Sequence, residues 1–340
     1  MELGIRRGTA QRGARVCSLV RERSLVRERD LSRGRSLVRE RGRARPLGAG
    51  WWLIAAVRVS VTLTMGLLPT DAMAQAFGKN KVPRHDRSWR VFHSPNFDFH
   101  YYPEEREAAQ EALLLAERAY ERLSRILDHE IEDPIPFLFY ASQTEFRETR
   151  AIRGLIGEGT SGVTELLKRR VVVPFTGSYA DLDHVITHEL VHAFQIDILS
   201  QAGFGRSVGS ISWAPPLWVM EGLAEYLSTP GMNHHTEMWV RDALVTGRLL
   251  SVEQLSRVGD IRVYRFGQSL VAHIGEEFGD EMLGSWFRSM ARRHSLERGT
   301  SESIGLTLEK LSADWADSLR HRYLPDLLER EKPAAYGRQL

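Results

Sequence analysis

The sequence has a single cysteine, Cys17, in a chain of 340 residues. A lone thiol forms no disulfide within the chain, and Cys17 lies in an arginine-rich leader outside the part that we expect to fold. Disulfide-held scaffolds and cysteine-held metal clusters are therefore excluded there. A metal site in the folded part would have to use histidine and carboxylate ligands, which suit zinc in an oxidising compartment.

Long hydrophobic runs are also scarce. Residues 51–68 form the one extended apolar stretch, and Arg58 interrupts it. The small residues that follow predict a secretory signal peptide over residues 51–76, with cleavage after Ala74 or Ala76. The alternative is an uncleaved membrane anchor, for which the apolar stretch is short. Either interpretation predicts export to the periplasm, the cell surface or the medium.

The part expected to fold has no excess of basic charge. Residues 1–46 hold fourteen arginines against five acidic residues, whereas residues 75–340 hold 31 basic and 38 acidic residues, a net charge of −7. Nucleic acid is therefore not an expected partner of the folded domain. The leader, residues 1–50, repeats Ser-Leu-Val-Arg-Glu-Arg three times between residues 18 and 41, and we expect it to be disordered. A basic arm for anionic lipid or nucleic acid, or a start codon assigned too far upstream, would each account for it.

A mixed helix and strand pattern occupies residues 88–330. We expect an α+β fold with a small mixed sheet in an N-terminal lobe, residues 88–177, and a mostly helical C-terminal lobe, residues 178–330. Pro174 suits an edge strand, although an ordinary sheet strand fits equally well. The main expected elements are strands at 97–102, 135–140 and 170–175 and amphipathic helices at about 103–127 and 306–324.

The strongest chemical signal is His-Glu-Leu-Val-His at residues 188–192, inside a segment, residues 181–199, that is apolar nearly all round. In a helix, this spacing puts the imidazoles of His188 and His192 one turn apart on one face, where they can bind the same metal ion. Glu189 lies about 100° round the helix, close enough to act on a water bound to that ion. Polar residues in a buried helix need partners, and a divalent cation supplies them. The alternative is a pair of core histidines hydrogen-bonded to the backbone.

A second segment carries two carboxylates. Residues 215–226 read Pro-Pro-Leu-Trp-Val-Met-Glu-Gly-Leu-Ala-Glu-Tyr, and the proline pair opens a predicted helix in which Glu221 and Glu225 share a face. One could bind the metal while the other accepts the N–H of a ligating histidine. Two histidines and one glutamate leave a fourth tetrahedral position for water, as in catalytic zinc sites. The alternative is an exposed carboxylate pair, against which the apolar neighbours argue.

Together, His-Glu-x-x-His and Trp-x-x-Glu-Gly-x-Ala-Glu-Tyr resemble the paired helices of the gluzincin metallopeptidases of clan MA. Within that group the chain is similar, over about residues 88–330, to bacterial peptidase-MA-like domains often fused to a TolB-type β-propeller. The resemblance implies a zincin-like fold with zinc in the cleft. It also implies that an edge strand beside the zinc, here the strand with Pro174, could pair with an extended substrate. No Gly-Ala-Met-Glu-Asn exopeptidase motif is present, so the aminopeptidase branch is not indicated. The roles that the resemblance implies are metal ligands at His188, His192 and Glu221, the catalytic base at Glu189 and a supporting carboxylate at Glu225.

Tyr264, His184 and His273 are further candidates for functional roles. Gluzincins commonly supply an oxyanion donor from beyond the second helix, and Tyr264 is the candidate here, with a packing role as the alternative. His184 lies one turn before His188, and we expect it to support the site, because a third helical ligand would over-fill it. His273 lies in an apolar segment and is expected to be a hydrogen-bonded core histidine.

These patterns predict an exported zinc-dependent peptidase that uses Zn²⁺ to cleave a peptide or protein substrate. Two other classes stay open. A non-catalytic zinc-binding scaffold would need the metal ligands but could lose Glu189, whose presence argues against that class. A membrane-anchored processing module would retain residues 51–68 as its anchor and associate with the membrane through them, with the same chemistry in another location.

Overall fold

The structure is a computed structural model, and it describes residues 21–24, 88–149, 152, 160–165, 168–203 and 213–329. All of these belong to one compact unit. The signal peptide predicted at residues 51–76, and the leader apart from residues 21–24, lie outside the described part of the chain. Within that part, no helix has the length and apolar character needed to cross a bilayer.

The sheet has six strands in the order β1-β2-β3-β4-β6-β5. It is mixed: β3, β4 and β6 are parallel, whereas β1, β2 and β5 pair antiparallel with their neighbours. The predicted small mixed sheet is therefore confirmed. The strands are β1 (Arg21–Ser24), β2 (Arg90–His93), β3 (Phe97–Tyr101), β4 (Ile135–Tyr140), β5 (Val163–Glu165) and β6 (Arg170–Pro174).

Two details of the sheet differ from the expectations. Four leader residues form β1, because the free edge of β2 offers backbone groups for antiparallel pairing. The strand that contains Pro174 is not at the edge, since β6 lies between β4 and β5. Pro174 is tolerated there because β5 pairs only with residues 170–172 of β6, so Pro174 lies beyond that ladder. The edge strand on this side is β5.

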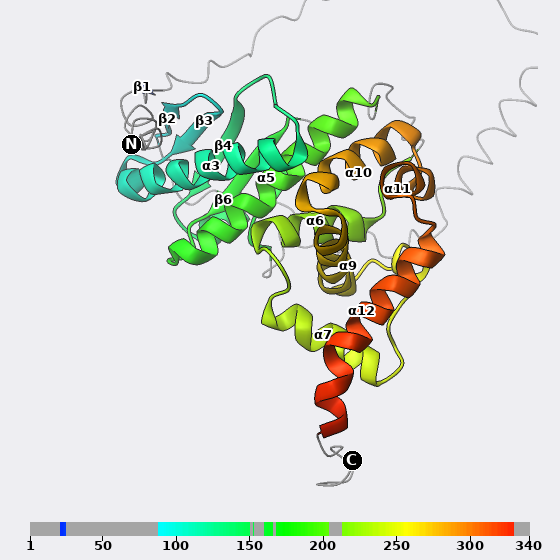
Figure 1. Ribbon diagram of the computed structural model, residues 1–340. Coiled ribbons are helices and arrows are strands. Elements are labelled where there is room, and N and C mark those ends of the chain that lie inside the picture. Colours follow the sequence, from blue (N-terminus) through cyan, green and yellow to red (C-terminus); the bar gives the residue numbers. More distant parts are fainter. Residues whose placement is uncertain are drawn as a thin grey trace, which may run out of the picture. The chain divides into compact units, whose positions relative to one another are not determined.

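Helices cover the sheet on both faces. Alternating side chains of the strands, such as Phe137 and Phe139, join the main core, and Tyr140 and Val172 join a small cluster on the other face with Phe146. The main core is continuous from the strands into the C-terminal helices, so the two predicted lobes share one core. Figure 1 shows the helices α3 (Arg106–Leu127) and α5 (Tyr179–Gln201) side by side against the sheet.

The rest of the described chain is mostly helical, as predicted. A short 3₁₀ helix, η1 (Pro103–Glu105), precedes α3, and α4 (Gln143–Glu148) packs on β4 and β6. The described residues thus form a mixed α+β fold in which helix predominates. After α5 follow α6 (Leu217–Ser228), α7 (His234–Val245), α8 (Val252–Leu255), α9 (Arg262–Phe278), α10 (Asp280–Arg293), α11 (Leu296–Ile304) and α12 (Leu308–Glu329).

Candidate metal centre

The helix α5 presents the two predicted histidine ligands. Ser178 caps its first turn by accepting a hydrogen bond from the backbone N–H of Asp181, and the helix then runs unbroken for 23 residues through the core. His188 and His192 project from one face, with their Nε2 atoms 3.2 Å apart. The predicted i, i+4 arrangement is therefore present.

The helix α6 brings the predicted carboxylate to these nitrogens. The Oε2 atom of Glu221 lies 3.4 Å from Nε2 of His188 and 3.3 Å from Nε2 of His192. Three ligands at about 2.0–2.1 Å from a tetrahedral zinc ion are separated by about 3.3 Å from one another. The three donor atoms therefore have the spacing of three corners around one cation, and they form one of two potential metal-binding groups among the described residues.

A close crossing of α6 and α9 fixes the position of that carboxylate. A Cβ atom on Gly222 would lie 2.4 Å from the backbone carbon of Gly267, and one on Gly267 would lie 2.7 Å from the carbonyl oxygen of Trp218. Only glycine permits this approach. Because Gly222 follows Glu221 directly, the crossing sets how α6 faces α5 and brings the first turns of α9 to the site.

Replacing Gly222 with alanine is expected to force the two helices apart. We expect Gly222→Ala to lower the free energy of unfolding by about 1–3 kcal/mol through overpacking, and the melting temperature by roughly 2–12 °C. Thermal unfolding followed by circular dichroism measures this change. The control is Gly259→Ala, because a Cβ atom at Gly259 would meet nothing within 4 Å. Equal stability of the two variants would contradict the close crossing.

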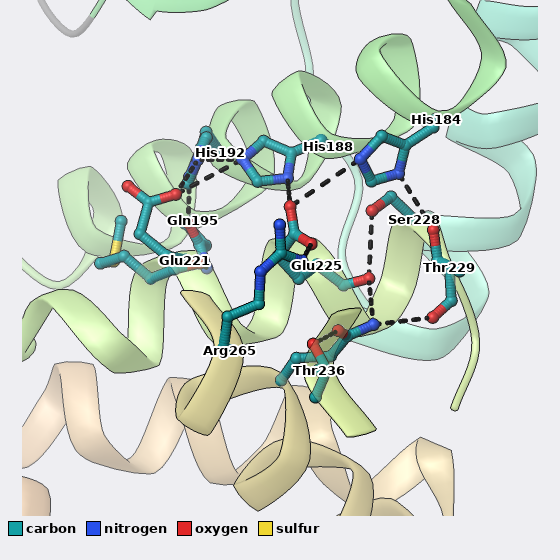
Figure 2. Close-up of polar contacts among 12 residues, drawn as sticks. His184, His188, His192, Gln195, Glu221, Glu225, Ser228, Thr229, Thr236 and Arg265 are labelled. Atoms are coloured by element: carbon teal, nitrogen blue, oxygen red, sulfur yellow. Dashed lines mark hydrogen bonds and ion pairs between the residues drawn. The ribbon is translucent and has the colours of Figure 1, made fainter. Parts of the chain in front are cut away.

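A second carboxylate, that of Glu225, contacts the other ring nitrogen of His188. The Oε1 atom of Glu225 lies 3.3 Å from Nδ1 of His188, and its Oε2 atom lies 3.4 Å from Nη1 of Arg265. Figure 2 shows the imidazole of His188 between Glu221 and Glu225. Such a carboxylate orients the ring and directs Nε2 towards a metal. The expected supporting role of Glu225 therefore agrees with its position.

His184 joins the same network at its outer edge. Its Nε2 atom lies 3.8 Å from Oε1 of Glu225, and its Nδ1 atom is 3.0 Å from the hydroxyl of Thr229 (Figure 2). His184, His188 and Glu225 make up the second potential metal-binding group. His188 would have to use Nδ1 for an ion there, and that nitrogen faces Glu225, so the contact fits a supporting role better than a ligating one.

The other histidine is oriented by a residue that the sequence did not single out. Nδ1 of His192 is 2.8 Å from Oε1 of Gln195, and the amide of Gln195 donates to the carbonyl oxygen of Met220 on α6. Because the amide nitrogen is used for Met220, Oε1 accepts the Nδ1 proton of His192, which leaves Nε2 free for a metal. Its position three residues after His192, on the same helical face, was the available signal.

The side chain of Glu189 is buried, with 6% of the residue exposed. The hydroxyl of Thr164, on the edge strand β5, lies 2.7 Å from Oε2 of Glu189 and 2.8 Å from its carbonyl oxygen. A Cβ atom on Gly162 would lie 2.8 Å from Cγ of Glu189. Glu189 is thus held against the start of β5, a contact that the sequence did not predict.

Tyr264, the predicted oxyanion donor, faces the site from the first turn of α9. Its ring lies 6.4 Å from the ring of His188 and nearly parallel to it. Burial raises the pKa of Tyr264 to about 12, with the charges of Glu221, Glu189 and Glu225 adding to the effect. The phenol therefore stays protonated at neutral pH and can donate a hydrogen bond.

The electrostatics of the site favour a cation. Burial lowers the pKa of His188, but the contacts with Glu221 and Glu225 outweigh burial and raise it to about 10. Burial raises the pKa of Glu221, whereas the contacts with His188 and His192 lower it to about 2. The carboxylates that stabilise a proton on His188 would stabilise a divalent cation in the same place.

The geometry therefore brings together every residue that the sequence assigned to the site, and it adds Thr164, Gln195 and Arg265. Two histidines and one carboxylate form a donor set that could hold a zinc ion with one position open, and Glu189 lies next to the first histidine on α5. No protein-family model matches the chain, and no curated protein matches it either.

Proposed function

We propose that this protein is a zinc-dependent peptidase of the gluzincin type, with a zincin-like fold. The observation that carries the proposal is the spacing of His188, His192 and Glu221, whose three donor atoms lie 3.2–3.4 Å from one another. Glu189 follows the first ligand on the same helix, which is the position of a general base in the His-Glu-x-x-His motif. We also propose that the protein is exported, because residues 51–76 are predicted to be a signal peptide.

The roles of the side chains follow from their positions. A zinc ion at the three donors would lower the pKa of a bound water and polarise the carbonyl group of a peptide bond. Glu189 takes the proton released in the attack on that carbonyl and delivers it to the leaving amine. Tyr264 donates a hydrogen bond to the oxygen that becomes negative in the transition state. Glu225 and Gln195 hold the two imidazoles in the ligating tautomer.

The edge strand β5 is the expected binding surface for the peptide backbone. Antiparallel pairing with β6 leaves its other edge free of strand partners within the described sheet. Thr164 of β5 contacts the base, so a peptide paired with this edge would pass beside Glu189. The strand that would pair with the substrate is therefore β5, and not β6, the strand that contains Pro174. The proposed substrate is an extended segment of a peptide or protein.

Thr164 is expected to position the base. We expect Thr164→Val to lower kcat by roughly 10- to 100-fold, because a hydrogen bond to a charged group contributes about 1.5–3 kcal/mol. KM should change little, since the hydroxyl contacts Glu189 rather than the peptide. Steady-state cleavage of a fluorogenic peptide measures both constants. Thr164→Ser keeps the hydroxyl and should restore most of kcat, and equal activity of the two variants would refute the positioning role.

The function itself is tested by cleavage of casein or a peptide library. Purified protein is expected to cleave peptide bonds, lose the activity with a chelator and regain it with Zn²⁺. If zinc-loaded protein cleaves none of these substrates, the peptidase proposal fails.

A further inference from the structure

A second cavity lies between α9 and α12 and shares no residue with the metal centre. Its volume is about 170 Å³, and residues of both helices and of the link between α6 and α7 line it. A cavity of about 150 Å³ is large enough for a molecule of the size of benzene. The space therefore suits a small ligand and is too small for a folded partner.

The floor of this cavity has hydrogen-bonding groups that the described residues do not satisfy. His273 is only 6% exposed, and its ring forms no hydrogen bond with another residue in the described part of the chain. One turn earlier, Ser269 accepts a hydrogen bond from the indole of Trp315 at 3.0 Å, and its own proton has no acceptor there. Burial lowers the pKa of His273, so the neutral ring offers one donor and one acceptor. A ligand with a polar tip would satisfy both groups.

The rim carries opposite charges. Glu276, on α9, and Arg322, on α12, both line the cavity and both are exposed. Nη2 of Arg322 pairs with Glu237 at 2.6 Å, and the remaining N–H groups of its guanidinium can still donate. A ligand at this rim meets carboxylate groups and a guanidinium group, and a zwitterion offers one charged group to each kind.

Apolar side chains complete the lining of the cavity: Met232, Ala272, Trp315 and Leu319. A metal ion is not indicated, since neither of the potential metal-binding groups in the described residues lies here. The lining therefore combines exposed charged groups, apolar side chains and buried polar groups.

We propose that this cavity binds a free α-amino acid with a short polar side chain. Its ammonium group faces Glu276, its carboxylate faces Arg322, and its side chain reaches Ser269 and His273. The inference stands on this cavity alone and does not depend on the proposed peptidase activity.

The test measures binding of L-threonine, L-serine and L-asparagine to the full chain by isothermal titration calorimetry and by thermal shift. At least one should bind, and at about ten times its Kd it should raise the melting temperature by roughly 3 °C. For threonine, L-valine replaces the hydroxyl with a methyl group of similar size, and 2,3-dihydroxybutanoate replaces the ammonium group with a neutral hydroxyl. Each analogue should bind roughly tenfold more weakly. Absence of binding by all three amino acids would overturn the proposal.

Variants assign the binding to this cavity. Arg322→Met and Glu276→Gln should each weaken binding at least tenfold. The controls are Arg320→Met and Glu277→Gln, at exposed positions nearby that do not line the cavity, and they should leave binding unchanged. The melting temperature of each unliganded variant shows that the fold is retained. His273→Leu should abolish the preference for threonine over valine. Binding that survives Arg322→Met and Glu276→Gln unchanged would place the ligand elsewhere and overturn the assignment.

Discussion

Glu189→Gln is expected to remove peptide cleavage while the protein keeps its zinc. The amide has the same size and can still accept a hydrogen bond from Thr164, but it cannot take a proton from the attacking water. General acid and base catalysis contributes about 10²–10⁴-fold, so kcat should fall by at least that range. Cleavage kinetics and zinc content, measured on the same preparation, give the two results together.

The matched control is Glu111→Gln, at an exposed position of α3. This variant should retain both activity and zinc. If Glu189→Gln cleaves peptides as fast as the wild type, the assignment of the base is wrong. If the wild type and Glu189→Gln both bind zinc and neither cleaves any of the peptides, the non-catalytic scaffold replaces the peptidase as the explanation.

Glu221→Ala has the second large expected effect, the loss of the metal itself. Zinc held by protein side chains has a binding free energy of about 10–16 kcal/mol, so losing one of the three protein ligands should lower the affinity on the order of 10³-fold. Glu221 is also the carboxylate in contact with both Nε2 atoms, so its removal takes away the nearest negative charge. Competition with a chromogenic chelator measures the affinity.

Glu225→Gln separates a ligand from a supporting residue. Glu225 lies one turn further along α6 and contacts Nδ1 of His188, so the amide should lower the zinc affinity only about 10- to 100-fold. Both proteins should give the helical circular dichroism spectrum of the wild type. Equal affinities of Glu221→Ala and Glu225→Gln would mean that Glu221 is not a ligand.

The core of the site could be predicted because its information is local. The i, i+4 spacing of His188 and His192 and of Glu221 and Glu225 fixes which side chains share a helical face. The buried character of both helices was also visible in their apolar flanks. Pairing the two helices around one ion then required only the chemistry of the donors.

The rest depends on contacts between distant segments, which no local period encodes. Thr164 reaches Glu189 across 25 residues of sequence, and Arg265 reaches Glu225 across 40. The edge position of β5 follows from strand order, and a three-residue strand carries too short a pattern to predict its place. The approach of Gly222 to Gly267 depends in the same way on how α6 and α9 cross.

For His273, the sequence predicted burial but not the surroundings of the ring. Its apolar helix correctly predicted burial. A buried histidine usually has hydrogen-bond partners, but this one lines a cavity between α9 and α12 and forms no hydrogen bond with another described residue. Whether a polar core residue is satisfied depends on packing, which the helical period does not specify.

We propose that one cation at His188, His192 and Glu221 makes this protein a peptidase. The most direct measurement is zinc titration of chelator-treated protein with peptide cleavage followed at each step. We expect activity to rise linearly and to saturate at one zinc ion per chain, with His192→Ala inactive throughout the titration. Cleavage that persists in the metal-free protein, or zinc binding to the wild type with no cleavage at saturation, would contradict the claim.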